Sequence, residues 1–208
     1  MTPVLVPAYA PPISYMAWML GQEKISWVTD SHYKKQTYRN RAYIYGANGR
    51  LTLTVPILHT HQQAHQKENK VQTDPNTHWQ KLHWKSLEAA YRSSPFFEFY
   101  EADFYPLYHQ SQPNLYAFNR NLLNTITDLL ELNIEQEEVS FDAECHQLTE
   151  NWLNAKKPDI VFAPYTQVFQ NKYGFLTDLS VLDLLFNLGP ESLMYLRECQ
   201  SQINPNST

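Results

Sequence analysis

The sequence is poor in cysteine and glycine. Its 208 residues include 2 Cys and 5 Gly against 13 Pro, so proline rather than glycine punctuates the chain. Cys145 and Cys199 lie far apart, without a CxxC or Cys/His spacing. This spacing argues against a disulfide framework and against a structural zinc site, and it fits a reducing compartment.

Long hydrophobic runs are also lacking. A membrane-spanning helix needs roughly 18 uninterrupted apolar residues, and Pro, Asp or Gly breaks each candidate stretch before that length. Residues 1–20 carry no basic segment, and prolines at positions 3, 7, 11 and 12 interrupt their apolar residues. We therefore interpret this stretch as the first folded element rather than a signal peptide, and we expect a cytoplasmic protein without a membrane span.

Composition points to a folded chain and gives no reason to expect a nucleic-acid partner. The content of 43% hydrophobic and 14% aromatic residues is enough for one substantial core. The net charge of -5 gives no overall reason to expect nucleic-acid binding. Nothing in the sequence indicates an oligomeric state.

The N-terminal third has the pattern of a small sheet. Val4–Val6 and Ile25–Thr29 have the composition of strands, and Ile13–Leu20 between them is typical of a helix, which predicts a parallel βαβ unit. Ala42–Ile57 predicts a hairpin around the turn Gly46–Gly49. The polar residues that follow, 59–75, lack periodicity and predict a surface loop.

The rest of the chain reads mostly as helix. Helical patterns are expected from Trp79 to the Ser93-Ser94-Pro95 stop, over the aromatic segment 96–108, from Pro113 onward and over 140–153. The acidic run 135–138 is interpreted as a solvated connection and 159–162 as a late strand. Ser180 and Asp183 have capping-box spacing, and Gly189 predicts a helix stop. The predicted fold class is α/β, a small mixed or parallel sheet from the N-terminal third with a predominantly helical C-terminal two thirds.

One long stretch contains no acidic residue. From Ser31 to Lys67 there is no Asp or Glu, and the stretch carries the basic residues Lys34, Lys35, Arg39, Arg41, Arg50 and Lys67 with His32, His59, His61 and His65. This segregation predicts an anionic small-molecule ligand, because the guanidinium group binds two oxygens of a phosphate or carboxylate at once. The candidate ligand residues are Lys35, Arg39, Asn40 and Arg41. The alternative is an ordinary solvated face.

His83 is the candidate acid–base residue. It lies on the apolar side of its predicted helix, between Trp79 and Leu87, where a hydrogen-bonded core histidine is the commoner interpretation. In an enzyme it would be the general base, with Tyr91 as its hydrogen-bonding neighbour. The histidines of the segment 59–83 show no compact ligand spacing, and no nucleotide-binding motif is present, so the sequence indicates no metal and no cofactor.

Four stretches resemble the WbqC-like protein family, first named from bacterial surface-polysaccharide gene clusters. They are Pro7-Ala-Tyr-Ala-Pro-Pro-Ile-Ser-Tyr15, Lys35-Gln-Thr-Tyr-Arg-Asn-Arg41, Trp79 through His83 to Tyr91 with Pro95-Phe-Phe97, and Ser180-Val-Leu-Asp-Leu-Leu-Phe-Asn-Leu-Gly-Pro-Glu191. Val6 and Ser14 depart from the Gln and Gly that many members carry. The resemblance identifies a divergent member with one domain over residues 1–194, sheet-rich over 1–60 and mostly helical over 79–194, followed by a fraying end at 195–208.

The resemblance implies a function connected with activated sugars. It suggests a transferase that acts on a nucleotide sugar, or that adds an acyl or aminoacyl group to a sugar, in surface-polysaccharide (O-antigen) biosynthesis. A non-catalytic module that binds an acidic partner or anionic ligand is the alternative. In a third interpretation, Arg39 and Arg41 clamp the fold by pairing with acids such as Asp183 and Glu191. Supporting roles are expected for the remaining motif residues Tyr15, Trp79, Asp183, Asn187 and Glu191.

Overall fold

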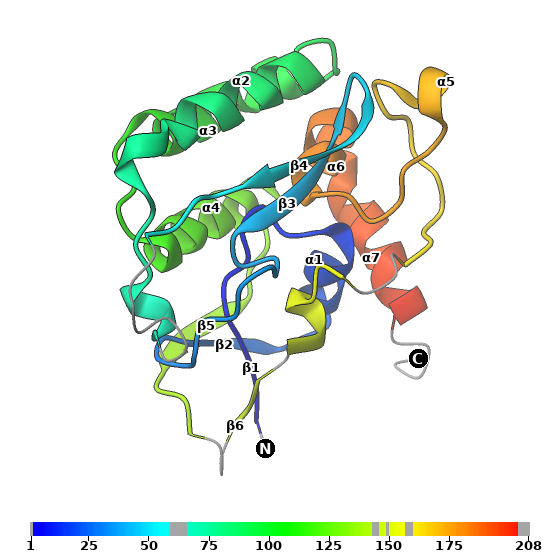
Figure 1. Ribbon diagram of the computed structural model, residues 1–208. Helices are drawn as coiled ribbons and strands as arrows, with labels where there is room; N and C mark the ends of the chain where they lie inside the picture. The colour runs from blue at the N-terminus through cyan, green and yellow to red at the C-terminus, as the bar shows by residue number, and fades with distance from the viewer. Residues whose placement is uncertain (1, 59–65, 143–145, 149, 157–159, 204–208) are drawn as a thin grey trace.

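A parallel four-stranded sheet forms the base of the molecule (Figure 1). The computed structural model describes residues 2–58, 66–142, 146–148, 150–156 and 160–203. The strand order is β5-β2-β1-β6, with β1 at Thr2–Leu5, β2 at Lys24–Val28, β5 at Glu135–Val139 and β6 at His146–Leu148. The predicted α/β class with a parallel sheet is confirmed.

The first two strands form the predicted βαβ unit. Helix α1, Ile13–Leu20, connects β1 to β2, and Val4 pairs with Ser26 in a parallel ladder. Because α1 buries most of its side chains and has the C-terminal helices, above all α7, as neighbours, it has the all-round apolar composition of a core helix rather than an amphipathic one.

Three expectations for the segment after residue 130 were wrong. The acidic run 135–138 is not a connection, because it forms most of β5, which pairs with β2 along its whole length. Lys24 neutralises part of this edge strand through Glu135 at 3.0 Å and Glu137 at 2.8 Å. The expected helix over 140–153 is replaced by β6 and a 3-10 turn at Glu150–Leu153. Residues 160–162 are irregular rather than a strand, and Asp159 lies outside the described residues.

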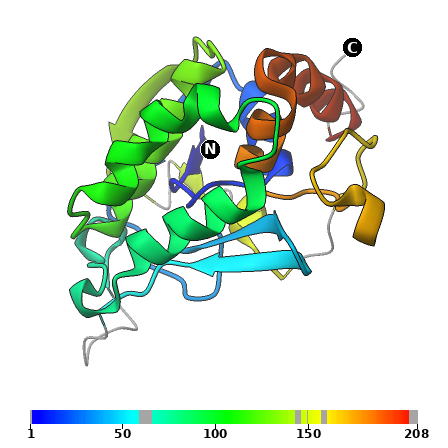
Figure 2. The same cartoon turned by 90° about the horizontal axis from the view of Figure 1, so that it is seen from above.

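The predicted hairpin is present and separate from the sheet. Strands β3, Arg41–Gly46, and β4, Gly49–Thr54, pair antiparallel around the expected turn. The hairpin lies beside helix α2, as both views of the ribbon show (Figures 1 and 2). The expected loop over 59–75 is partly outside the described residues, and its described part contains the 3-10 turns η2, Glu68–Lys70, and η3, Pro75–Thr77.

Helices supply the remainder of the core. They are α2 at Trp79–Tyr91, α3 at Phe97–His109, α4 at Leu115–Leu129, the short α5 at Gln170–Tyr173, α6 at Val181–Leu188 and α7 at Ser192–Ile203. Side chains from the sheet, the hairpin and all of these helices except α5 join one hydrophobic cluster. Gly189 ends α6 at φ 56°, as predicted, and an added Cβ there would overlap the Phe96 ring. In the described part of the chain, no helix is long and apolar enough to cross a membrane.

Candidate functional site

Arg39 lies in the interior and is paired with an acid. Its side chain is 1% exposed, and its Nε donates to Glu68 of η2. Glu68 is the first acidic residue after the acid-free stretch, so the clamp involves a different segment from Asp183 and Glu191. Since the two charges neutralise each other, Arg39 organises the site more than it attracts an anion.

The other three predicted ligand residues, which are near the Arg39–Glu68 pair in sequence or space, differ in how far they are buried. Asn40 is buried, and its Nδ2 donates to the backbone oxygen of Val55 at 3.0 Å. Arg41 is half-buried at the start of β3, with a buried Nε that has no hydrogen-bond partner among the described residues. Lys35 is exposed. Arg41 is therefore the best-placed motif cation for a ligand.

Buried polar atoms that lack a partner among the described residues concentrate around this motif. They belong to Ser31, Tyr33, Asn40, Arg41, Gln66, Asn69, Tyr116 and Asn119, which we call the polar cluster. Backbone contacts hold its segments together, since Tyr33 N donates to Gln66 O at 2.9 Å and Asn119 Nδ2 donates to Arg39 O at 2.7 Å. Buried polar atoms normally have partners, so this concentration indicates a place built for a polar ligand or for water.

Two tyrosine hydroxyls of the polar cluster have pKa values that are affected by the charged residues around them. Burial raises the pKa of Tyr33, and the charge of Glu68 raises it further while Arg39 and Arg41 oppose the shift. Burial likewise raises the pKa of Tyr116, with Glu138 adding to the shift and Arg120 opposing it. Both hydroxyls are therefore neutral donors at physiological pH, available to an acceptor oxygen.

An open cleft adjoins the polar cluster at the carboxyl ends of β2 and β5. This Arg120 cleft has a volume of about 630 Å³, and it is lined by Thr29, Asn69, Asn114, Tyr116, Ala117, Arg120, Asn121, Asn124 and Glu138. Ligands of open α/β sheets bind outside the carboxyl ends of strands. Arg120 Nη1 donates to Gln136 Oε1 at 2.9 Å, and its guanidinium lies 4.6 Å from the centre of the Trp27 ring. These contacts hold a positive charge at the cleft.

His83 lies in the core, in a hydrogen-bonded pair with Tyr9. Its Nδ1 is 2.8 Å from the Tyr9 hydroxyl, which is 3.3 Å from the Tyr108 hydroxyl. Burial lowers the pKa of His83 to about 4, and a hydrogen bond with the backbone of Thr54 opposes this shift. The imidazole is therefore neutral at pH 7. Trp79 packs edge-on against it with 5.3 Å between ring centres.

Tyr91 belongs to a different buried group, centred on Asp183. The carboxylate of Asp183 accepts from Tyr91 at 2.8 Å, Tyr165 at 2.5 Å and Gln167 at 3.0 Å. Burial raises the pKa of Asp183 to about 6, although these hydrogen bonds oppose the shift. Tyr91 and His83 thus hydrogen-bond to separate partners, so the structure does not bring them together as an acid–base pair.

The remaining motif residues differ in their environments. Tyr15 is buried and donates to Val6 O at 3.0 Å. Asn187 Nδ2 donates to the backbone oxygen of Asp183 at 2.7 Å. Glu191 is exposed. Within the described residues, no group of three or more His, Cys, Asp or Glu side chains could hold a metal ion.

The N-terminus of α1 is occupied by a carboxylate of the chain itself. Asp178 accepts from the backbone N and the Oγ of Ser14, both at 2.8 Å. A helix N-terminus after a strand is a common phosphate site, but here Asp178 neutralises it. This helix N-terminus is therefore not available to an anion.

Sequence reasoning overlooked most of the cleft. Arg120 lies on the half-buried side of α4, where the hydrophobic pattern gives no signal, and Tyr116 is one of the buried residues of that helix. Glu138 lies in the strand that was interpreted as a connection. Glu68 had a signal, since it ends the acid-free stretch directly after Lys67.

Similarities to known proteins agree with the motifs. A model of the WbqC-like protein family matches residues 7–155. The chain is 29% identical over 202 residues to the uncharacterized protein Rv1507c of Mycobacterium tuberculosis, an alignment that covers 82% of this chain and 86% of that protein. No solved structure matches the chain significantly.

Proposed function

Because the chain belongs to the WbqC-like protein family, we propose that it is a transferase that binds an anionic activated donor, such as a nucleotide sugar, in the Arg120 cleft. The transfer would contribute to surface-polysaccharide synthesis. The observation that carries the proposal is the polar cluster, which reaches this cleft at Asn69 and Tyr116 beside Arg120, because an unpartnered donor such as the Tyr116 hydroxyl suits the oxygens of such a ligand.

The cleft also offers groups for the transfer step. Glu138 is the carboxylate that lines it, and in this proposal it takes the proton of an acceptor hydroxyl or amine as that atom bonds to the transferred group. The bond to the donor phosphate breaks at the same time, and the leaving phosphate keeps the electron pair, stabilised by Arg120. His83 and Tyr91, both buried with partners, serve as positioning residues here.

Ligand-dependent stabilisation tests the binding step. Thermal unfolding is measured with UDP-, dTDP-, GDP- and CMP-sugars, acyl-CoA and inorganic phosphate. One donor class should stabilise the wild type increasingly with concentration, by about 2.7 kcal/mol at a hundredfold excess over Kd. Arg120→Gln and Arg41→Gln should lose this stabilisation. Arg197→Gln, an exposed position on α7, is the matched control and should keep it.

A turnover assay distinguishes a transferase from a binding module. With the stabilising donor and a panel of acceptors, mass spectrometry should detect a modified acceptor with the wild type, and Glu138→Gln should bind donor but lose the product. Donor binding without product for any acceptor would favour the binding module. Equal stabilisation of Arg120→Gln and the control would refute the assignment of the cleft.

A further inference from the structure

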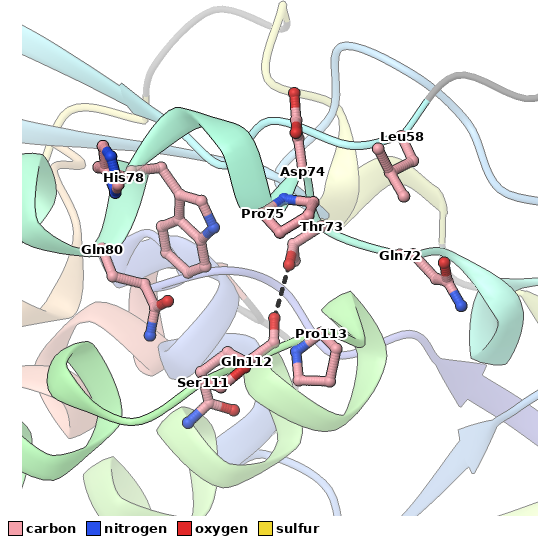
Figure 3. Close-up of a pocket in the computed structure, with 11 residues that line it drawn as sticks. Leu58, Gln72, Thr73, Asp74, Pro75, His78, Gln80, Ser111, Gln112 and Pro113 are labelled. Carbon is pink, nitrogen blue, oxygen red and sulfur yellow. Dashed lines mark hydrogen bonds between the residues drawn. The ribbon is translucent and has the colours of Figure 1, made fainter.

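A second cleft lies between the segments that lead into α2 and α4 (Figure 3). It has a volume of about 290 Å³. Thr73 fixes its floor, because its N donates to Pro113 O at 3.0 Å and its Oγ1 donates to Gln112 O at 2.6 Å. The next residue along the chain is held as well, because Asp74 N donates to Pro56 O at 2.9 Å. These contacts make the cleft a built feature of the fold.

The lining of this Gln72 cleft differs in chemistry from that of the Arg120 cleft. It contains neither Lys nor Arg, and its formally charged side chain is the carboxylate of Asp74. The lining also contains Gln72, whose side chain is exposed, and Gln112, which is half-buried. A carboxamide both donates and accepts, as a hydroxyl group does. The lining therefore suits an uncharged ligand rich in hydroxyl groups and repels an anion.

A residue with a strained backbone conformation lines the Gln72 cleft. His78, which lines the cleft, has φ 40° and ψ 29° at the start of α2. A left-handed conformation costs free energy for a residue other than glycine, and such residues cluster at ligand-binding sites.

The two clefts meet at one backbone bridge. Gln72 of the second cleft pairs with Asn114 of the first in an isolated antiparallel bridge. Asn114 also ties the two sides together, since its Nδ2 donates to Asn69 O and its Oδ1 caps α4 by accepting from Ala117 N, both at 2.9 Å. The bridge is thus a shared border of the two clefts.

We infer that the Gln72 cleft is an acceptor subsite for a neutral polyhydroxylated ring, which presents a hydroxyl or amino group toward the Arg120 cleft. The inference rests on the proposed function, because an acceptor needs a donor beside it. The linings differ in charge, because the Arg120 cleft has a cation, Arg120, beside Glu138, whereas the charge of the Gln72 cleft is the carboxylate of Asp74. An anionic donor is therefore disfavoured in the Gln72 cleft.

Side-chain amide signals in a nitrogen–proton NMR spectrum provide a direct test. Gln72→Leu and Gln112→Leu assign the two signals by their disappearance. Methyl glucoside and N-acetylglucosamine are the neutral probes, and glucuronate is the matched anionic probe. The neutral probes should shift both signals, glucuronate should shift them at about tenfold higher concentration or not at all, and the double variant should lose the binding. Gln202→Leu, exposed on α7, should bind like the wild type.

The possible results separate this inference from the proposed function. Donor-induced thermal stabilisation should survive in the double variant, whereas Arg120→Gln should keep the neutral-probe shifts. Donor binding with no effect of any neutral probe on the two signals, or equal binding of glucuronate, overturns the acceptor subsite and leaves the donor site intact. Neutral-probe shifts in a protein that binds no donor would support the polyol site and defeat the transferase.

Discussion

At the scale of the residue, the buried tyrosines differ in whether their hydroxyl groups have a hydrogen-bond partner, and this difference distinguishes a structural role from a ligand-binding one. Tyr15 donates to Val6 O at 3.0 Å, whereas the Tyr33 hydroxyl is buried and lacks a partner among the described residues. Removing a satisfied hydroxyl leaves its acceptor unpaired, while removing an unsatisfied one relieves a desolvation cost. The two tyrosines should therefore respond oppositely to the same substitution.

Replacement by phenylalanine tests this difference. Tyr15→Phe should lower the free energy of unfolding in urea by about 1 kcal/mol, and Tyr33→Phe should leave it unchanged or raise it by up to about 1 kcal/mol. Tyr33→Phe should also weaken donor binding if the hydroxyl contacts the ligand. Equal destabilisation by the two substitutions would show that the Tyr33 hydroxyl already has a water partner, and would remove it from the ligand site.

At the scale of the element, α1 depends on a cap from a distant segment. Its N-cap residue is Pro12, which offers no side-chain acceptor, and Asp178 supplies one instead through Ser14. Asp178 itself has φ 51°, a conformation that Asp and Asn tolerate better than most residues. The segment before α6 is thus joined to the βαβ unit.

Substitutions at the two ends of this contact should lower the free energy of unfolding by different amounts. Asp178→Ala should lower the free energy of unfolding by about 1–2 kcal/mol, because it removes both hydrogen bonds and the charge that favours a helix N-terminus. Ser14→Ala should cost less, since the backbone bond remains, and Asp178→Asn should lie between them. Chemical denaturation followed by circular dichroism measures all three. A negligible effect of Asp178→Ala would mean that the cap contributes little to α1.

The elements also show what hydrophobic pattern can and cannot reveal. The βαβ unit and the hairpin were predictable because their strands have buried faces or a specific turn. Strand β5 was not, because an edge strand is tolerant of charge, and Glu135–Glu138 pair through their backbone while their side chains stay exposed. Charge segregation in the sequence pointed to Arg39–Arg41, but it could not indicate Tyr116 or Arg120, which the fold brings to the motif from α4.

At the scale of the whole molecule, two buried groups have opposite pKa shifts. The raised pKa of Asp183, about 6 against an ordinary 3.8, contributes stability that is present below pH 3.8 and lost as the pH rises through 6. The lowered pKa of His83, about 4 against an ordinary 6.5, contributes stability that is present above pH 6.5 and lost as the pH falls through 4. Each effect is on the order of 3 kcal/mol, so the two offset each other across the same range.

Single variants should reveal the pH dependence of stability that each group contributes. Between pH 4 and 6.5 these two groups together should change the free energy of unfolding of the wild type only slightly. Urea titrations at intervals of half a pH unit measure it. Asp183→Asn leaves His83 uncompensated, so its stability should rise with pH over this range, whereas the stability of His83→Gln should fall. Parallel pH profiles for the two variants would contradict the opposite shifts. A wild-type profile as steep as that of either variant would show instead that one group dominates, and an NMR titration of the His83 ring would then identify which.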